Sequence, residues 1–205
     1  MEQHKSKSTQ PRFARRWAIL YYPWLRVPKV SDIGLTNGIS VIGDGRNILA
    51  VSGDGDAYLY SKIRAEWTKC DRMPTEGRRF YACGVVTSED ENGDEDDIEI
   101  VVAGGRNATG ALATADIYSL KQSSWRSGPS LPHPIENAAS VPFGDTFLIV
   151  GGMSEAKYLD TIFRYDAESA AWALLDASLS EARVNAVAMM VDRALFHENL
   201  QLTSG

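Results

Sequence analysis

The chain has 205 residues, of which 44% are apolar and 23% charged, a composition that excludes a disordered protein. Its formal charge of −6 is local, because eight acidic residues lie at positions 89–99 and the rest of the chain is close to neutral. The net charge therefore gives no support for a polyacidic protein or for a protein that binds nucleic acid. Two cysteines, Cys70 and Cys83, and three scattered histidines are too few for a disulfide scaffold or a dedicated metal centre. We expect free thiols and no cofactor.

The N-terminal segment, residues 1–34, is basic, since its first thirty positions hold seven Lys or Arg and one Glu. Its apolar stretch, 17–25, has nine residues and is interrupted by Pro23. This stretch fits neither a signal peptide nor a membrane span, which needs about 20 apolar residues. We therefore expect no membrane association and a cytoplasmic protein, with an extracellular location left open.

A Tyr–Trp pair then recurs three times. In each copy Trp follows Tyr by seven positions: Tyr60 and Trp67, Tyr118 and Trp125, Tyr165 and Trp172. In two copies an apolar strand and a glycine pair come first, and the second glycine lies thirteen residues before Tyr: Gly104-Gly105 and Gly151-Gly152. The first copy has Ser52-Gly53 and a shorter connection. The Trp spacings are 58 and 47, and the extra eleven residues match the acidic run, which indicates an insertion in a period of about 47.

These features resemble kelch repeats over roughly residues 36–192. The resemblance implies an all-β, kelch-type β-propeller of four-stranded antiparallel blades. We expect complete repeats at 35–75, 76–133 and 134–180, a partial repeat at 181–196, and a tail at 197–205. Within 35–192, three blades and part of a fourth fall short of the four to eight blades of a closed ring. The sequence thus predicts an incomplete propeller, which is a truncated gene product, a fragment or an alternative ending, and whose uncovered terminal blades promote self-association.

The pattern also predicts local structure. In the third repeat we expect four strands, at Ala138–Val141, Phe147–Val150, Thr161–Tyr165 and Ala171–Leu174. The three tryptophans are expected to pack between blades, and the glycine pairs to allow sharp turns and close backbone approach. A fourth repeat begins at Val184, but His197-Glu198 stands where its glycine pair is due. Residues 16–22 are a weak candidate for an outer strand of a preceding blade.

The acidic run is interpreted as a solvated loop over 88–97 that joins the first two strands of its blade. A docking segment for a basic partner is the alternative. The acidic run does not match a calcium-binding loop, because Glu95 and Val101 occupy positions that require Gly and Glu.

For function, the resemblance implies a protein-interaction module, a scaffold or adaptor without catalysis. In kelch adaptors, the loops between blades and the loops after the glycine pairs form a face that recognises short peptides. Arginines on such a face suit an acidic peptide. Ordinary solvated loop residues are the alternative reading of the same positions. The implied partner-binding residues are Arg78, Arg79, Arg106, Asn107, His133, Lys157 and Arg183.

A fragment of a kelch-type carbohydrate-active enzyme is the alternative function. Kelch-type sugar oxidases hold copper with Tyr and His side chains, and three scattered histidines offer no convincing set of this kind. A site like that of the kelch-type sialic-acid isomerases is left open.

Overall fold

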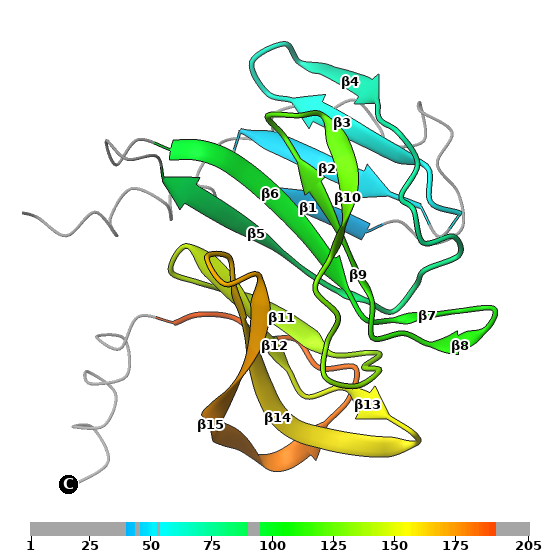
Figure 1. Ribbon diagram of the computed structural model, residues 1–205, viewed down its shortest axis with the longest axis vertical. Helices are drawn as coiled ribbons and strands as arrows, with labels where there is room; N and C mark the ends of the chain where they lie inside the picture. Colours follow the sequence, from blue (N-terminus) through cyan, green and yellow to red (C-terminus); the bar gives the residue numbers. More distant parts are fainter. Residues whose placement is uncertain (1–39, 44–45, 53, 90–94, 192–205) are drawn as a thin grey trace, which may run out of the picture.

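The computed structural model describes residues 40–43, 46–52, 54–89 and 95–191, and these form strands and turns only (Figure 1). The predicted segment 1–34, its candidate strand at 16–22 and the tail 197–205 lie outside the described residues. Within the described ranges, no helix is long and apolar enough to cross a bilayer.

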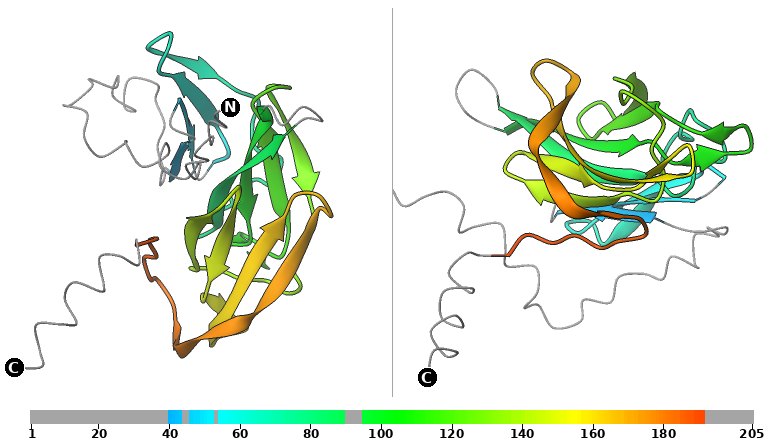
Figure 2. Two further views of the ribbon diagram at one scale, coloured as in Figure 1. Left: turned by 90° about the vertical axis from the view of Figure 1, so that its left-hand side faces the viewer. Right: turned by 90° about the horizontal axis from the view of Figure 1, so that it is seen from below.

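Three antiparallel sheets follow one another along the chain, from top to bottom in Figure 1. In a view turned by 90°, the N-terminal and C-terminal sheets lie on either side of the central one (Figure 2, left). The first has the order β1-β2-β3-β4 and the second β10-β9-β6-β5, so that each is a four-stranded blade. The first blade comprises β1 (Ser40–Gly43), β2 (Asn47–Val51), β3 (Ala57–Ser61) and β4 (Glu66–Lys69). The second comprises β5 (Ala82–Glu89), β6 (Glu95–Ala103), β9 (Ala115–Ser119) and β10 (Ser124–Gly128).

The third sheet has the same core of four strands. It pairs β11 (Ala139–Phe143), β12 (Thr146–Val150), β14 (Lys157–Asp166) and β15 (Ala171–Arg183), while β13 (Met153–Ser154) forms a hairpin with the start of β14. All four predicted strands are present, but the predicted end of the last one at Leu174 is wrong. It continues to Arg183 because β14 is itself extended and offers further pairing, with bulges on either side of Thr161.

The Tyr–Trp spacing has a direct explanation in the strand register. In each blade, the third and fourth strands are joined by a tight turn that places the two aromatic residues opposite each other. The ring centroids are 5.2, 5.1 and 5.0 Å apart in the three blades. The repeat in the sequence is therefore a repeat of cross-strand aromatic pairs.

Two of the tryptophans also join neighbouring blades. The indole Nε1–H of Trp125 donates to the carbonyl oxygen of Asp71, and that of Trp172 to the carbonyl oxygen of Pro129, at 2.9 Å in both cases. Each acceptor lies in the connection that leaves the preceding blade. The prediction of inter-blade packing is confirmed for these two residues.

Two apolar clusters lie between the blades. One joins the first and second blades through residues such as Leu49, Val51 and Ile100. The other joins the second and third through residues such as Val101, Ile117 and Phe147. Successive residues of β6, such as Ile100 and Val101, thus face opposite neighbouring blades. This is why both faces of the strand are apolar at these positions.

At the glycine pairs, the backbone of one blade closely approaches the backbone that leads into the next repeat. Gly104 and Gly151 have φ values of +67° and +64°, and the second glycine of each pair is also in the positive-φ region. A Cβ atom on Gly104 would lie 2.3 Å from the carbonyl oxygen of Ile135, and one on Gly151 would lie 2.6 Å from that of Arg183. Both carbonyls belong to the residues that lead into the next repeat, so the predicted turn and close approach are confirmed.

The acidic run is more ordered than predicted. It does join the first two strands of its blade, but those strands reach into it, as β5 extends to Glu89 and β6 begins at Glu95. Asp97 accepts hydrogen bonds from Ser119 Oγ at 2.6 Å and from the backbone N–H of Lys121 at 3.0 Å. The predicted loop over 88–97 is therefore wrong at both ends, because its flanking residues pair across the hairpin.

Of the predicted fourth repeat, residues 184–191 are described, and they form no strand. They run away from the third blade (Figure 2). The remainder of this predicted repeat, 192–196, lies outside the described residues.

A pair of glycine substitutions separates steric clash from backbone strain. Gly104 (φ +67°) and Gly144 (φ +65°) have nearly the same backbone conformation, but a Cβ at position 144 would meet nothing within 4 Å. Gly144→Ala should cost only the strain of a left-handed residue, about 1–2 kcal/mol. Gly104→Ala should cost this strain and about 1–3 kcal/mol more, because the Ile135 carbonyl cannot move without shifting the next blade. Urea unfolding of both variants measures the difference, and equal costs would contradict the proposed contact.

The thiol of Cys83 provides a second test. It lies partly buried on β5, and burial raises its pKa from 9.0 to about 11, against a smaller opposite effect of Ser140. Because the thiolate is the reactive form, modification at pH 8 should be about 100-fold slower in the folded chain than in urea. Since the folded pKa is the higher one, this group's contribution to stability is complete below pH 9 and is lost as the pH rises toward 11. Thiol-reagent kinetics in a Cys70→Ser background measure the effect.

Candidate functional site

The connections between blades and the segments after the glycine pairs lie together, as the resemblance implied. The backbones of Arg79 and Arg106 exchange two hydrogen bonds of 2.9 Å, and those of Glu136 and Met153 form the equivalent bridge in the third blade. We call this region the loop face. It consists of residues 75–81, 106–111, 133–138 and 153–157.

An ion pair links the two blades across the loop face. Arg106 Nη1 lies 3.4 Å from a carboxylate oxygen of Glu136. Arg106 follows the glycine pair of the second blade, whereas Glu136 leads into the first strand of the third. The side chain of Arg106 is 45% exposed and that of Glu136 only 7%. The guanidinium is therefore accessible to solvent, while the carboxylate that it contacts is buried.

Two further predicted residues lie on the loop face. Asn107 is at the start of the small hairpin formed by β7 (Arg106–Asn107) and β8 (Gly110–Ala111). Its Oδ1 accepts hydrogen bonds from the backbone N–H and the hydroxyl of Thr109, at 3.0 and 2.7 Å, which stabilises the turn. Lys157 is exposed at the start of β14, opposite Ser154. Of these two residues, Lys157 is the more exposed and is the one that carries a positive charge.

His133 and Arg183 are placed differently. The ring of His133 is partly buried, with its centroid 5.8 Å from that of Phe163 in an edge-to-face arrangement. It therefore belongs partly to the packing between blades. Arg183 is exposed at the end of β15, and its Nη2 lies 2.9 Å from a carboxylate oxygen of Glu181. Its carbonyl accepts a hydrogen bond from Gly152, so its backbone adjoins the loop face.

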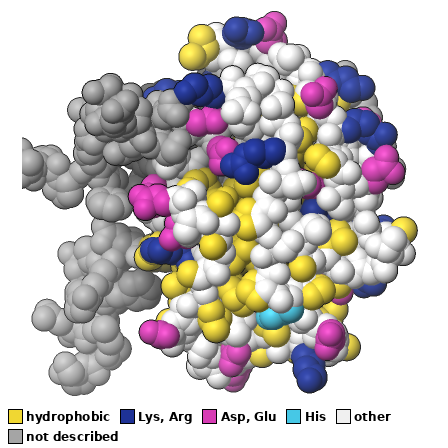
Figure 3. All heavy atoms as spheres, in the orientation of Figure 1, with side chains coloured by type: hydrophobic (Ala, Val, Ile, Leu, Met, Phe, Trp, Pro, Cys, Tyr) yellow, Lys and Arg dark blue, Asp and Glu magenta, His cyan; other side chains and the backbone are white. Residues whose placement is uncertain are grey.

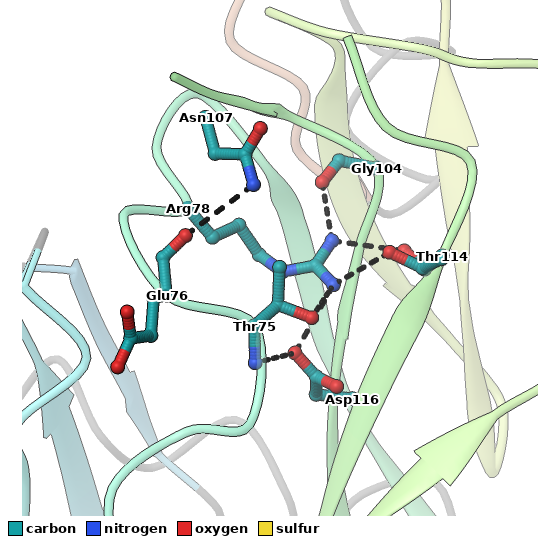
Figure 4. Close-up of polar contacts among 7 residues, drawn as sticks. All are labelled: Thr75, Glu76, Arg78, Gly104, Asn107, Thr114 and Asp116. Carbon is teal, nitrogen blue, oxygen red and sulfur yellow. Dashed lines mark hydrogen bonds and ion pairs between the residues drawn. The ribbon is translucent and has the colours of Figure 1, made fainter. Parts of the chain in front are cut away.

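Arg78 is not on the surface, and its prediction as an exposed partner-binding residue is corrected by the structure. Its side chain is 0% exposed and pairs with Asp116, 4% exposed, at 3.0 Å (Figure 4). Burial lowers the pKa of the Arg78 guanidinium, while the carboxylate of Asp116 acts in the opposite direction. The pair is thus a structural element of the second blade.

The remaining donors of Arg78 bind the backbone around the glycine pair. Nη1 donates to the carbonyl oxygens of Gly104 and Thr114, and Nη2 donates to the hydroxyls of Thr75 and Thr114 (Figure 4). Asp116 also accepts a hydrogen bond from the backbone N–H of Thr75. This network ties the lead-in of the blade to the ends of its inner strands, and so fixes where the neighbouring Arg79 and Arg106 lie.

No group of three or more His, Cys, Asp or Glu side chains among the described residues could hold a metal ion. In the orientation of Figure 1, cations and anions are interspersed around the periphery, while apolar side chains gather nearer the middle (Figure 3). This side of the molecule is therefore mixed in charge.

The Arg78–Asp116 pair predicts a strong dependence on both partners. Arg78→Met leaves a buried carboxylate without its counter-charge, and Asp116→Leu leaves a buried guanidinium alone. Each should cost about 3–5 kcal/mol in the free energy of unfolding. The double variant removes both charges and should cost clearly less than the sum of the two. Urea unfolding of the three variants and the wild-type chain completes this double-mutant cycle. Additive costs in the free energy of unfolding would contradict the pairing.

Comparisons with known proteins agree with this architecture. A family profile described as "Kelch motif" matches residues 99–132, which include the pair Gly104-Gly105 and the pair Tyr118–Trp125. Two proteins named Kelch-like protein 36, from Rattus norvegicus and Mus musculus, are each 29% identical over 117 residues. The match covers 56% of this chain but only 17% of either relative.

The matched segment lies in the second blade, whose glycine pair and cross-strand Tyr–Trp pair recur in the third blade. The chain thus contains a kelch motif, and its antiparallel sheets have the form of kelch-type β-propeller blades.

Proposed function

We propose that the chain is a protein-interaction module, without catalysis, that binds an acidic peptide segment of a partner on its loop face. Kinship with kelch-like proteins supports a protein partner in general. The acidic character of the partner is inferred from the side chains of this chain.

The observation that carries this proposal is the placement of Arg79 beside Arg106. Their backbones are joined by two hydrogen bonds, and both side chains are exposed. Directly bridged residues on antiparallel segments have their Cβ atoms about 4.5–5.5 Å apart. Two guanidinium groups can therefore reach the same anionic segment.

The contact with Glu136 prepares Arg106 for such a ligand. Only Nη1 of Arg106 faces this carboxylate, and a guanidinium has five N–H donors in a planar fork. Donors therefore remain for a bidentate contact with a partner carboxylate. Because Glu136 restrains the arginine beforehand, less side-chain entropy is lost when a ligand binds.

The acidic insertion lies away from the loop face. β5 leaves the loop face at Ala82 and reaches Glu89 after eight residues, which is roughly 25 Å of extended chain. The backbone at the described ends of the insertion, Glu89 and Glu95, thus lies more than two Debye lengths from the start of β5 at physiological salt.

Substitution of the two arginines tests the proposal. Arg79→Ala and Arg106→Ala should each weaken the binding of a labelled Glu-Gly repeat peptide by about 5- to 150-fold, which corresponds to about 1–3 kcal/mol. Affinity should also fall as the salt concentration rises. Fluorescence anisotropy measures both effects, with a Gln-Gly peptide as the uncharged ligand.

Arg64→Ala is the matched control. This arginine is also exposed but lies in the turn between β3 and β4, at the other end of its blade. Its loss should leave binding unchanged. Equal weakening by Arg64→Ala would indicate a non-specific charge effect, and full binding by the Arg79/Arg106 double variant would refute the loop face as the site.

We also propose that the chain associates with itself through uncovered surfaces of its terminal blades. Large apolar side chains are exposed in and after the third blade, among them Tyr158, Leu174 and Val187. Such exposure favours contact with another polypeptide. This contact is independent of the acidic-peptide site.

A further inference from the structure

Phe80 has a backbone conformation that phenylalanine rarely adopts. Its φ is +58°, in the left-handed region where a bulky side chain is strained. Its place in the repeat is defined by backbone hydrogen bonds. The N–H of Asn137 donates to the carbonyl of Phe80 at 2.9 Å, and the N–H of Asn185 donates to the carbonyl of Asn137 at 3.0 Å. The three residues therefore occupy equivalent positions in successive lead-ins.

The two equivalent residues suit this conformation, whereas Phe80 does not. Asn137 and Asn185 have φ values of +56° and +53°, and asparagine is one of the residues that tolerate the left-handed region best. Phe80 has nearly the same φ with an aromatic ring attached. The chain thus carries a strained residue at a position where asparagine stands in the other two lead-ins. Strain of this kind is typical of functional sites.

Packing within the chain does not account for the ring of Phe80. This residue is 55% exposed, whereas Phe147 in the apolar cluster is 1% exposed. Within the described ranges, no other aromatic ring packs against Phe80. Phe80 lies inside the continuous range 54–89, and its bonded neighbour Asn137 belongs to the range 95–191. The segments that adjoin it along the chain and across the loop face are therefore described.

The exposed ring stands beside the arginines of the loop face. Phe80 directly follows Arg79, so their Cα atoms are about 3.8 Å apart, and the backbone of Arg79 is bridged to that of Arg106. Asn137, which bonds to Phe80, directly follows Glu136, whose carboxylate lies against Arg106. One exposed ring and two exposed guanidinium groups are thus gathered in a small area. Aromatic residues and arginine are the side chains enriched in protein interfaces.

We propose that Phe80 binds an aromatic side chain of the partner, next to the acidic residues that Arg79 and Arg106 contact. This inference rests on the proposed acidic-peptide site and specifies which side chain accompanies the acids. An aromatic side chain would bury the exposed part of the ring, and paired rings gain free energy beyond the area that they bury. A basic side chain is disfavoured at the same place, because the two arginines repel it.

Two peptides and one variant test the proposal. The peptides are labelled Glu-Gly repeats in which one central Gly is replaced by Phe or by Ala. The whole chain should bind the Phe peptide at least about fivefold more tightly than the Ala peptide. Phe80→Asn should bind both peptides alike, with the affinity of wild-type chain for the Ala peptide. The fivefold preference should persist as salt rises, although both affinities fall, because salt screens only the charges.

Stability separates a binding role from a structural one. Because asparagine tolerates the left-handed region, Phe80→Asn should leave the midpoint of urea unfolding unchanged or raise it. Phe143→Asn is the matched control. Phe143 is 41% exposed and lies at the end of β11 that is remote from the loop face. Its replacement should leave the preference for the Phe peptide intact.

The outcomes distinguish the aromatic contact from the acidic-peptide site. Equal binding of the two peptides by wild-type chain would overturn the role of Phe80 and leave the acidic-peptide site in place. A preference that survives Phe80→Asn, or that is lost equally in Phe143→Asn, would do the same. A lower urea midpoint for Phe80→Asn would show that the ring stabilises the fold, and would also overturn the inference. Failure of wild-type chain to bind either peptide would overturn both proposals.

Discussion

The contact between a glycine pair and the next repeat underlies the arrangement of the blades. The N–H of the second glycine donates to a carbonyl that belongs to the following repeat, and the first glycine leaves room for that carbonyl. Backbone meets backbone, so this contact does not depend on which side chains flank it. It requires only that no Cβ is present and that φ is positive, and glycine meets both conditions without cost. The Trp indoles and the apolar clusters then fill the space that this contact defines.

Because this contact does not depend on side chains, the same position in the repeat can carry three different kinds of side chain. Arg78, Ile135 and Arg183 each precede a repeat in the same way. In the second repeat the side chain is a buried cation paired with Asp116, in the third it is an apolar residue of the core, and in the fourth it is exposed. Because backbone contacts already determine the path of the chain, the side chain at this position can either pack in the interior or lie on the surface, where a partner can contact it.

The sequence was sufficient to predict the fold but not the accessibility of individual residues. Tyr and Trp seven positions apart are local signals, since a tight turn between two strands brings them opposite each other. The glycine pairs are local in the same sense. By contrast, the burial of Arg78 depends on Asp116, which is 38 residues away, and nothing in the neighbouring residues distinguishes it from the exposed Arg79. Gly84 shows the same limit. It reads as an ordinary strand glycine, yet a Cβ there would lie 2.1 Å from the ring of Phe147 in the next blade.

Because the second glycine of each pair donates to a carbonyl about thirty residues further along the chain, this contact cannot form until the fourth strand of the blade has left the ribosome. Gly105 must wait for Ile135, which follows β10, and Gly152 for Arg183, the last residue of β15. During synthesis the second blade would therefore remain loosely attached until the lead-in of the third emerges, after which it becomes fixed. Assembly would proceed in one direction, with a delay of one inter-blade connection, and a pause in translation just before such a lead-in would prolong the interval in which a newly made sheet is open to incorrect contacts.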